Sequence, residues 1–188
     1  MKDVVLFHSV YGLRPAVLAA ADLLRAAGHE VATPDLYGGP VASSIEEGFA
    51  ISERVGWEAI QRRARDAVQD VPADAVLAGI SMGAGVVGEL LVERPGTAGL
   101  LLLNGVGGHP RAARGGLPVQ VHVGAGDTMF PPVNVAAWQR GMTAAGAAVE
   151  VFTYPGVRHF FTDSEADEYD EAAADLAWQR GLDFLAGV

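Results

Sequence analysis

The 188-residue chain contains no cysteine, and only one of its 13 basic residues is a lysine. Without thiols it can form neither a disulfide nor a thiolate metal site, and it has no cysteine nucleophile. The net charge is −10 and there is no basic stripe to neutralise phosphates, so nucleic acid is not an expected partner. The first apolar run, residues 4–7, is too short for a signal peptide or a membrane span. We therefore expect a cytoplasmic protein that binds no membrane.

Half of the residues are hydrophobic and only 19% are charged, as expected when a parallel sheet is covered on both faces. Apolar runs predict strands at about 3–8, 29–33, 74–80, 98–103, 118–123 and 148–153. Between them the sequence predicts helices at about 14–27, 45–69, 82–93, 132–145 and 166–185. No stretch is typical of a linker, so we expect one α/β domain over residues 1–188, with a mostly parallel sheet and helices on both faces.

The segment Gly79-Ile80-Ser81-Met82-Gly83 is the most informative in the chain. It follows a predicted strand and precedes a predicted helix, which is the context of a Gly-x-Ser-x-Gly nucleophile elbow. The turn holds its serine at a strained backbone angle, so the residues two before and two after it must lack bulk. Ser81 is therefore the candidate nucleophile. The alternative is a small residue at a glycine-rich strand end.

Two further candidates follow predicted strands. Asp127 lies in the loop after residues 118–123, and His159 lies just beyond residues 148–153. The order Ser, Asp, His is that of α/β-hydrolases, and the carboxyl ends of parallel strands gather at one edge of the sheet. Asp127 would orient the imidazole of His159, which would take the serine proton.

Each of these assignments has a competitor. Asp127 could instead cap the following helix, since Gly-Asp turns are common. His109 and His122 compete with His159 for the role of the base. His122 lies inside a predicted strand, which favours a buried, hydrogen-bonded core residue. His109 precedes Asp127, against the expected order, and so is the weaker candidate.

Four segments resemble the dienelactone hydrolase family of α/β-hydrolases. They are residues 8–13, residues 34–37, the elbow at Ser81, and the pair formed by residues 126–127 and 154–159. The resemblance implies an α/β-hydrolase fold. We expect neither a cofactor nor a metal. Two positions depart from the family: its namesake enzymes carry cysteine in place of Ser81, and a glutamate that assists this cysteine in place of Ser9.

The same reasoning suggests an oxyanion hole. The elbow would supply the backbone N–H of Met82, and by resemblance the second donor is the N–H of Val10. Loop residues expected near the strand ends could contact substrate: Tyr11, Leu36, Tyr37, Phe130 and Phe160. Residues 38–56 could form a partial lid, whereas the tryptophans at 57, 138 and 178 are expected to pack on helices.

These features favour a serine hydrolase that cleaves small esters, lactones or thioesters through an acyl-enzyme. Alternatives are a peptidase, amidase or acyl thioesterase on the same fold, or a binding protein without catalysis. The expected partner is a small-molecule substrate, and the expected state is a monomer or weak homodimer.

The acidic run from Asp163 to Glu171 is expected to be a solvated cap of the last helix. Dienelactone hydrolases, by resemblance, hold a substrate carboxylate with arginines, one of them just beyond the histidine. Here residues 160–165 contain no cation and two acids, Asp163 and Glu165. Arg158 could point inward or remain solvated. We expect repulsion of anionic substrates and a preference for neutral ones.

Overall fold

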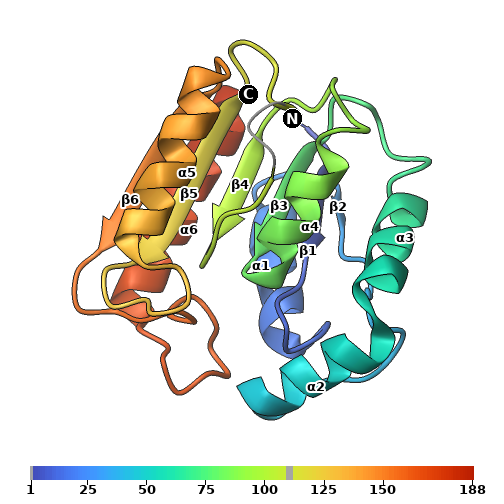
Figure 1. Ribbon diagram of the computed structural model, residues 1–188, viewed down its shortest axis with the longest axis vertical. Helices are drawn as coiled ribbons and strands as arrows, with labels where there is room; N and C mark the ends of the chain where they lie inside the picture. Colours follow the sequence, from blue (N-terminus) through green and yellow to red (C-terminus); the bar gives the residue numbers. More distant parts are fainter. Residues whose placement is uncertain (1, 109–111) are drawn as a thin grey trace.

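The computed structural model describes residues 2–108 and 112–188 (Figure 1). Within them lies one sheet of six strands: β1 (Val4–Phe7), β2 (Val31–Ala32), β3 (Val76–Ile80), β4 (Leu100–Leu103), β5 (Pro118–Gly124) and β6 (Ala148–Tyr154). Their order is β2-β1-β3-β4-β5-β6, and every neighbouring pair is parallel. The predicted α/β class with a parallel sheet is confirmed.

Helices cover both faces of the sheet (Figure 1). On one face lie α3 (Trp57–Ala67), α4 (Met82–Leu90) and α5 (Pro132–Ala144), and on the other lie α1 (Pro15–Ala26) and α6 (Glu171–Gly187). The helix α2 (Ile45–Val55) lies near the carboxyl ends of the strands.

Side chains along each strand alternate between two hydrophobic clusters, one on each face. In β1, Val5 and Phe7 pack into the cluster under α3, α4 and α5, whereas Val4 and Leu6 pack into the cluster under α1 and α6. All four are at most 1% exposed. Burial of a side chain of this size stabilises the fold by about 1.5–3 kcal/mol, so a strand covered on both faces is nearly all apolar.

The ends of several elements differ from the prediction. The helix expected over 45–69 is two helices, because Gly56 has φ +84° and ends α2 before α3 begins. The last helix begins at Glu171 rather than near 166, because the preceding residues form a structured loop. The strand expected over 29–33 pairs through only two residues. Pro15 at the first turn of α1 and Gly28 just beyond its end, with φ +95°, agree with the prediction.

The strand order reverses between β1 and β3. The chain passes from β1 outward to β2 and then returns to β3 on the other side of β1. In open parallel sheets, ligands bind in the crevice outside the carboxyl ends of the strands at such a reversal. The loops that leave β1 and β3 carry Val10 and Ser81. The topology therefore brings these two predicted site residues to one crevice.

Candidate active site

Ser81 occupies the sharp turn between β3 and α4, with φ 51° and ψ −107°. A residue with a Cβ rarely adopts this conformation. A Cβ on Gly79 would lie 2.4 Å from the backbone of Gly83, and a Cβ on Gly83 would lie 2.3 Å from the carbonyl oxygen of Phe7. Both distances are far below van der Waals contact. The two glycines are thus required because the backbones of β1, the elbow and α4 approach one another closely.

Ser81, His159 and Asp127 form a hydrogen-bonded chain. The Oγ of Ser81 lies 2.8 Å from Nε2 of His159, and Nδ1 of His159 lies 2.6 Å from Oδ2 of Asp127. None of the three residues is more than 4% exposed. Because an ionised carboxylate only accepts, Nδ1 carries the proton and donates a hydrogen bond to Asp127. Nε2 then presents its lone pair to the serine hydroxyl, which is the arrangement that a general base requires.

The carboxylate of Asp127 is held from its other side as well. Its Oδ1 accepts hydrogen bonds from the backbone N–H groups of Met129 and Phe130, both at 2.8 Å. Burial alone would raise the pKa of Asp127, but the hydrogen bonds from His159 and from these two N–H groups outweigh it and lower this pKa. Asp127 thus orders the turn before α5 and also orients His159.

Two aromatic rings fix the imidazole of His159. The ring of Phe130 stacks on it, with centroids 5.6 Å apart and planes 14° apart. The ring of Phe160 meets it edge-on at 4.2 Å. Together with the bond to Asp127, these contacts leave the imidazole little freedom to rotate away from Ser81.

The two residues whose backbone N–H groups are expected to form an oxyanion hole line the same pocket as Ser81. Val10 follows β1, Met82 is the first residue of α4, and both line the pocket beside the serine. Within residues 2–108 and 112–188, neither N–H donates to a protein acceptor. Two unpaired donors next to a nucleophile can receive a developing negative charge.

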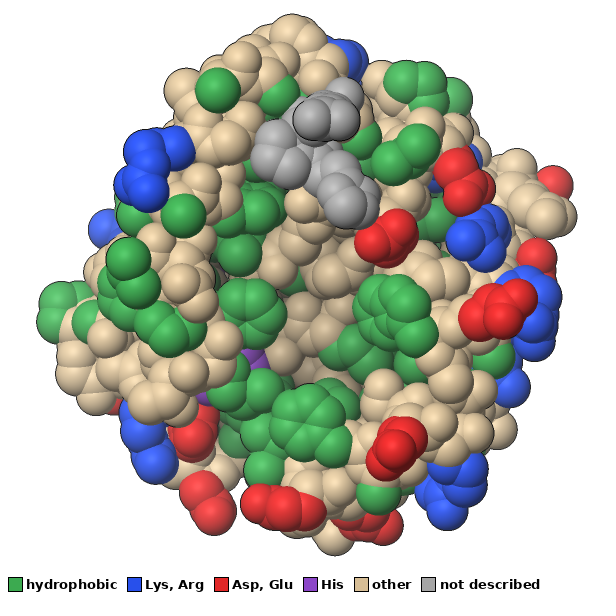
Figure 2. Space-filling model, in the orientation of Figure 1, with side chains coloured by type: hydrophobic (Ala, Val, Ile, Leu, Met, Phe, Trp, Pro, Cys, Tyr) green, Lys and Arg blue, Asp and Glu red, His purple; other side chains and the backbone are tan. Residues whose placement is uncertain are grey.

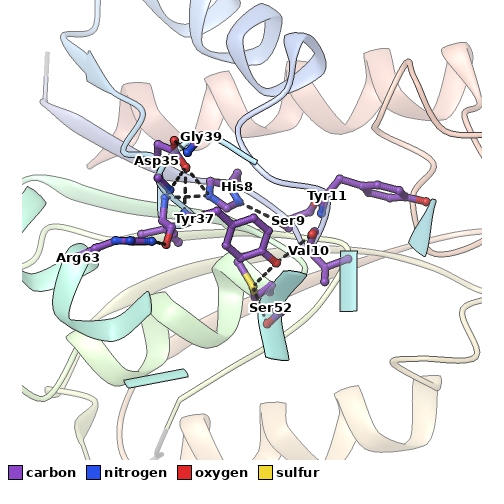
Figure 3. Close-up of polar contacts among 12 residues, drawn as sticks. His8, Ser9, Val10, Tyr11, Asp35, Tyr37, Gly39, Ser52 and Arg63 are labelled. Carbon is purple, nitrogen blue, oxygen red and sulfur yellow. Dashed lines mark hydrogen bonds and ion pairs between the residues drawn. The ribbon is translucent and has the colours of Figure 1, made fainter. Parts of the chain in front are cut away.

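A polar network lies behind the Val10 loop (Figure 3). His8 is fully buried; its Nδ1 donates to the carbonyl oxygen of Ser9 at 2.7 Å, and its Nε2 accepts from the N–H of Leu36 at 3.0 Å. Burial lowers the pKa of His8, so the ring stays neutral and can both donate and accept. Asp35 accepts the N–H groups of residues 37–39. The turn after β2 is thereby joined to the loop after β1.

A pocket of about 240 Å³ opens beside Ser81. It is lined by Val10, Phe49, Ser52, Trp57, Ser81, Met82, Gly85, Val106, Met129 and Phe130. No lining residue carries a charge, and Figure 2 shows hydrophobic side chains gathered around a hollow on this face. Ligand pockets for drug-sized molecules usually measure about 300–1,000 Å³. This pocket therefore suits a small and largely apolar ligand.

Of the five residues expected to contact substrate, only Phe130 lines this pocket. Leu36 and Tyr37 are 0% and 2% exposed; the N–H of Leu36 donates to His8, and the hydroxyl of Tyr37 donates to the carbonyl oxygen of Val10. Phe160, 2% exposed, packs against His159, and Tyr11 and Phe160 border a separate pocket. None of these four residues lines the pocket beside Ser81.

Three exposed apolar residues at the pocket were not expected there. Phe49, Trp57 and Met129 are 50%, 45% and 38% exposed. Trp57 packs on a helix as expected, because its ring lies against Gly85 of α4, and it borders the pocket as well. Phe49 and Ser52 lie three residues apart on one face of α2. The segment expected to form a partial lid thus contributes a wall of the pocket through α2.

The acidic run after His159 is a solvated helix cap only in part, because Asp170 and Glu171 are exposed at the start of α6 whereas Asp163 is buried. Asp163 is 5% exposed and accepts a 3.0 Å hydrogen bond from Nε of Arg14, which is equally buried. Glu165 accepts the N–H of Ala16 in the first turn of α1. Only Asp170 caps α6. Because Asp163 is neutralised by Arg14, the expected repulsion of an anionic substrate by this carboxylate has no basis.

Arg158 does not reach the Ser81 pocket. Its side chain is 62% exposed and lies 3.8 Å from Glu168. It lines a separate pocket bordered by Tyr11 and Phe160. No cationic side chain of the described residues borders the pocket beside Ser81.

His122 is confirmed as a core residue. It is fully buried, with Nδ1 2.8 Å from the hydroxyl of Tyr154 and Nε2 2.9 Å from Oε1 of Gln120. Burial, assisted by the nearby charge of Arg180, lowers the pKa of His122 to about 3. His109, the other competitor for the role of base, falls outside the described residues.

A search of residues 2–108 and 112–188 finds no group of three or more His, Asp or Glu side chains arranged to hold a metal ion. In the same residues no helix has the length and apolar character needed to cross a membrane.

Known proteins resemble this chain in sequence and in fold. The model of the dienelactone hydrolase family matches residues 1–188. A "Putative carboxymethylenebutenolidase" of Salmonella typhimurium is 35% identical over 69 residues, which are 37% of this chain and 26% of that protein. The match thus spans about a quarter of that relative's length.

Solved structures resemble the whole chain. A "Putative Dienelactone Hydrolase" from Klebsiella pneumoniae has a TM-score of 0.79 at 18% identity, with 100% of this chain and 88% of that one covered. A dienelactone hydrolase-like promiscuous phosphotriesterase from metagenomic libraries has a TM-score of 0.80 at 20% identity, with 100% and 86% covered. At such low identity these two similarities establish the fold alone.

Proposed function

Because the chain belongs to the dienelactone hydrolase family and has the α/β-hydrolase fold, we propose that it is a serine hydrolase of small, neutral carboxylic esters or lactones. One observation carries the proposal: the buried chain from Ser81 through His159 to Asp127 ends at an uncharged pocket. The hydroxyl, the acceptor nitrogen and the carboxylate have the relative positions that acyl transfer to serine requires.

In the first half of the reaction, the Oγ of Ser81 forms a bond to the carbonyl carbon of the ester. Nε2 of His159 takes the hydroxyl proton, and the carbonyl π electrons move to the oxygen. Asp127 stabilises the resulting imidazolium through its bond to Nδ1. When the oxyanion collapses, the carbon–oxygen bond to the alcohol breaks. The imidazolium then returns its proton to the leaving alkoxide, so an alcohol departs and an acyl-enzyme remains.

The oxyanion would be held by the N–H groups of Val10 and Met82. Both border the pocket and neither is engaged with another described residue. Loss of one such donor usually costs about 2.7–4 kcal/mol of transition-state stabilisation. In the second half, water replaces the alcohol: His159 accepts its proton, the hydroxide oxygen bonds to the acyl carbon, and Ser81 leaves with the proton returned to it.

The substrate class follows from the pocket lining. Ten residues without charge surround it, and no described cation is placed to pair with a substrate carboxylate. An anion that enters such a site loses its hydration without a partner, and an unpaired buried charge is strongly unfavourable. The volume of about 240 Å³ favours small acyl or alcohol groups. Neutral substrates are therefore expected.

A fluorophosphonate probe tests the proposal. Labelling followed by intact-protein and peptide mass measurement should find one adduct per chain, on the peptide that contains Ser81. The Ser81→Ala variant, shown by circular dichroism to be folded, should acquire no adduct and should lose short aryl-ester hydrolysis by several orders of magnitude. An unlabelled wild-type protein, or an adduct at another serine, would overturn the assignment.

A further inference from the structure

The hydroxyl of Tyr37 contacts both residues that carry the proposed oxyanion donors. It donates to the carbonyl oxygen of Val10 at 2.9 Å and lies 3.4 Å from the sulfur of Met82 (Figure 3). Tyr37 is 2% exposed and does not line the pocket, so it cannot contact substrate directly. Val10 follows β1 and Met82 follows β3. One side chain from the turn after β2 therefore joins the two halves of the hole.

The hydrogen bond from Tyr37 to the Val10 carbonyl oxygen restricts the direction of the Val10 N–H. In the described residues, no other donor reaches the Val10 carbonyl oxygen. The carbonyl and the N–H of one residue flank the same Cα, so a fixed carbonyl restricts the rotation that would tilt the N–H away. Gly48 of α2 closes the space on another side, since a Cβ there would lie 2.8 Å from the same oxygen. The Val10 loop is thus held between Tyr37 and α2.

Tyr37 is itself fixed at both ends. Its backbone N–H donates to Oδ1 of Asp35 at 2.9 Å. Its ring meets the buried ring of His8 edge-on, with centroids 5.0 Å apart. Burial raises the pKa of Tyr37 to about 12, so the hydroxyl keeps its proton at any pH where the enzyme would work.

We propose that Tyr37 is a positioning residue for the oxyanion hole, whose hydroxyl aligns the Val10 N–H with the Met82 N–H across the elbow. This inference rests on the proposed function, because it concerns the same tetrahedral intermediate. A positioning role predicts a specific defect. The variant should bind the ground-state ester normally and stabilise the oxyanion less well.

The experiment compares Tyr37→Phe with Tyr154→Phe. Tyr154 is a matched control, since it is 4% exposed and its hydroxyl bonds to His122 outside the site. Removal of an oxyanion donor costs about 100- to 1,000-fold in kcat, and misplacement of one should cost less. We expect kcat for a short aryl ester to fall on the order of 10- to 100-fold in Tyr37→Phe, with KM changed less than about twofold. Tyr154→Phe should retain wild-type kcat.

The inhibition constant of a trifluoromethyl ketone distinguishes a positioning role from a merely structural one, because a structural role alone would leave this constant unchanged. Ser81 Oγ bonds to the ketone carbon, its proton passes to His159, and the ketone oxygen becomes an oxyanion in the hole. The inhibition constant should therefore rise in Tyr37→Phe by the factor by which kcat/KM falls. An unchanged inhibition constant with unchanged kcat, in a folded variant, would overturn the proposal. So would an equal loss in Tyr154→Phe.

Two further substitutions at position 37 keep the test decisive if the phenylalanine variant does not fold. 4-Fluorophenylalanine fills the space of the hydroxyl without donating, and 4-aminophenylalanine restores a donor. The first should reproduce the defect and the second should reverse most of it; equal activity in both would refute the role.

Fluorophosphonate labelling separates the proposed function from the proposed role of Tyr37. An unlabelled Ser81 in the wild type would refute the proposed function. Labelling of Ser81 together with wild-type kinetics in Tyr37→Phe would refute only the role of Tyr37.

Discussion

Replacement of Ser81 by glycine should abolish turnover and yet give a more stable protein than replacement by alanine. At φ 51° and ψ −107°, position 81 adopts a backbone conformation that glycine accepts without strain. Alanine and serine both carry a Cβ and keep that strain. Each of the two variants loses the hydroxyl that bonds to His159, so this loss cancels when they are compared with each other.

The magnitude follows from two opposing contributions. A residue held in a sparsely populated region stores about 1–3 kcal/mol of strain, which glycine releases. Glycine loses about 0.5–1 kcal/mol relative to alanine, because its unfolded chain has more freedom. Ser81→Gly should therefore be more stable than Ser81→Ala by about 0–2.5 kcal/mol in free energy of unfolding, with a central value of about 1 kcal/mol. For a domain of this size each kcal/mol moves Tm by about 2–4 °C.

Urea and thermal unfolding followed by circular dichroism measure this difference. Position 52 supplies a control, because Ser52 lies inside α2, where the backbone is helical. There the order should invert, with Ser52→Ala more stable than Ser52→Gly by about 1 kcal/mol. If the glycine variant at position 81 were less stable than the alanine variant by about 1 kcal/mol, as expected at position 52, the elbow would store no strain.

Three further predictions follow. Asp127→Asn should lower kcat by about four orders of magnitude, since it disfavours the tautomer in which Nε2 of His159 accepts; steady-state kinetics on a folded variant would contradict this if kcat fell less than tenfold. For a matched pair of esters that differ only in a carboxylate, kcat/KM at low salt should favour the neutral one, and a clear preference for the anion would imply a cation that the pocket does not show. The pKa of His122 is 6.5 in the unfolded chain and about 3 in the folded protein, so as pH falls the unfolded chain takes up the proton before the folded protein does. The stability that His122 contributes is therefore present above pH 6.5 and is lost as pH falls toward 3, amounting to about 2 kcal/mol by pH 5. The free energy of unfolding of His122→Gln should depend less on pH over that range, and parallel curves for variant and wild type would count against a neutral buried imidazole.

Much of the fold could be predicted from local patterns. Strands covered on both faces are nearly all apolar, as in β4, and Pro15 and Gly28 mark the ends of α1. The place of Ser81 in a strand–turn–helix segment was also evident, because its two glycines report a close approach of backbones. Such signals are short sequence patterns, even where the contact that requires them, as between Gly83 and Phe7, joins residues far apart along the chain.

What could not be predicted depends on contacts across the fold. Nothing near Trp57 in the sequence indicates that its ring, packed against Gly85 of α4, also borders the pocket beside Ser81. Tyr37 was expected to contact substrate, whereas the packing of the turn after β2 directs its hydroxyl to Val10. From the sequence alone, Asp163 is expected to be a solvated acid, because its buried partner Arg14 lies far away along the chain. An exposed and a buried charge have the same sequence signature.

The pair of Arg14 and Asp163 also has a consequence for the order in which the protein assembles. The two residues are 149 positions apart, and Asp163 lies only four residues beyond His159. This contact joins the start of α1 to the loop that follows β6, so it can form only once the last quarter of the chain is present. A chain that ended before residue 159 would have neither this anchor nor the histidine. The proposed reactivity of Ser81 would therefore depend on the last residues of the fold to be made.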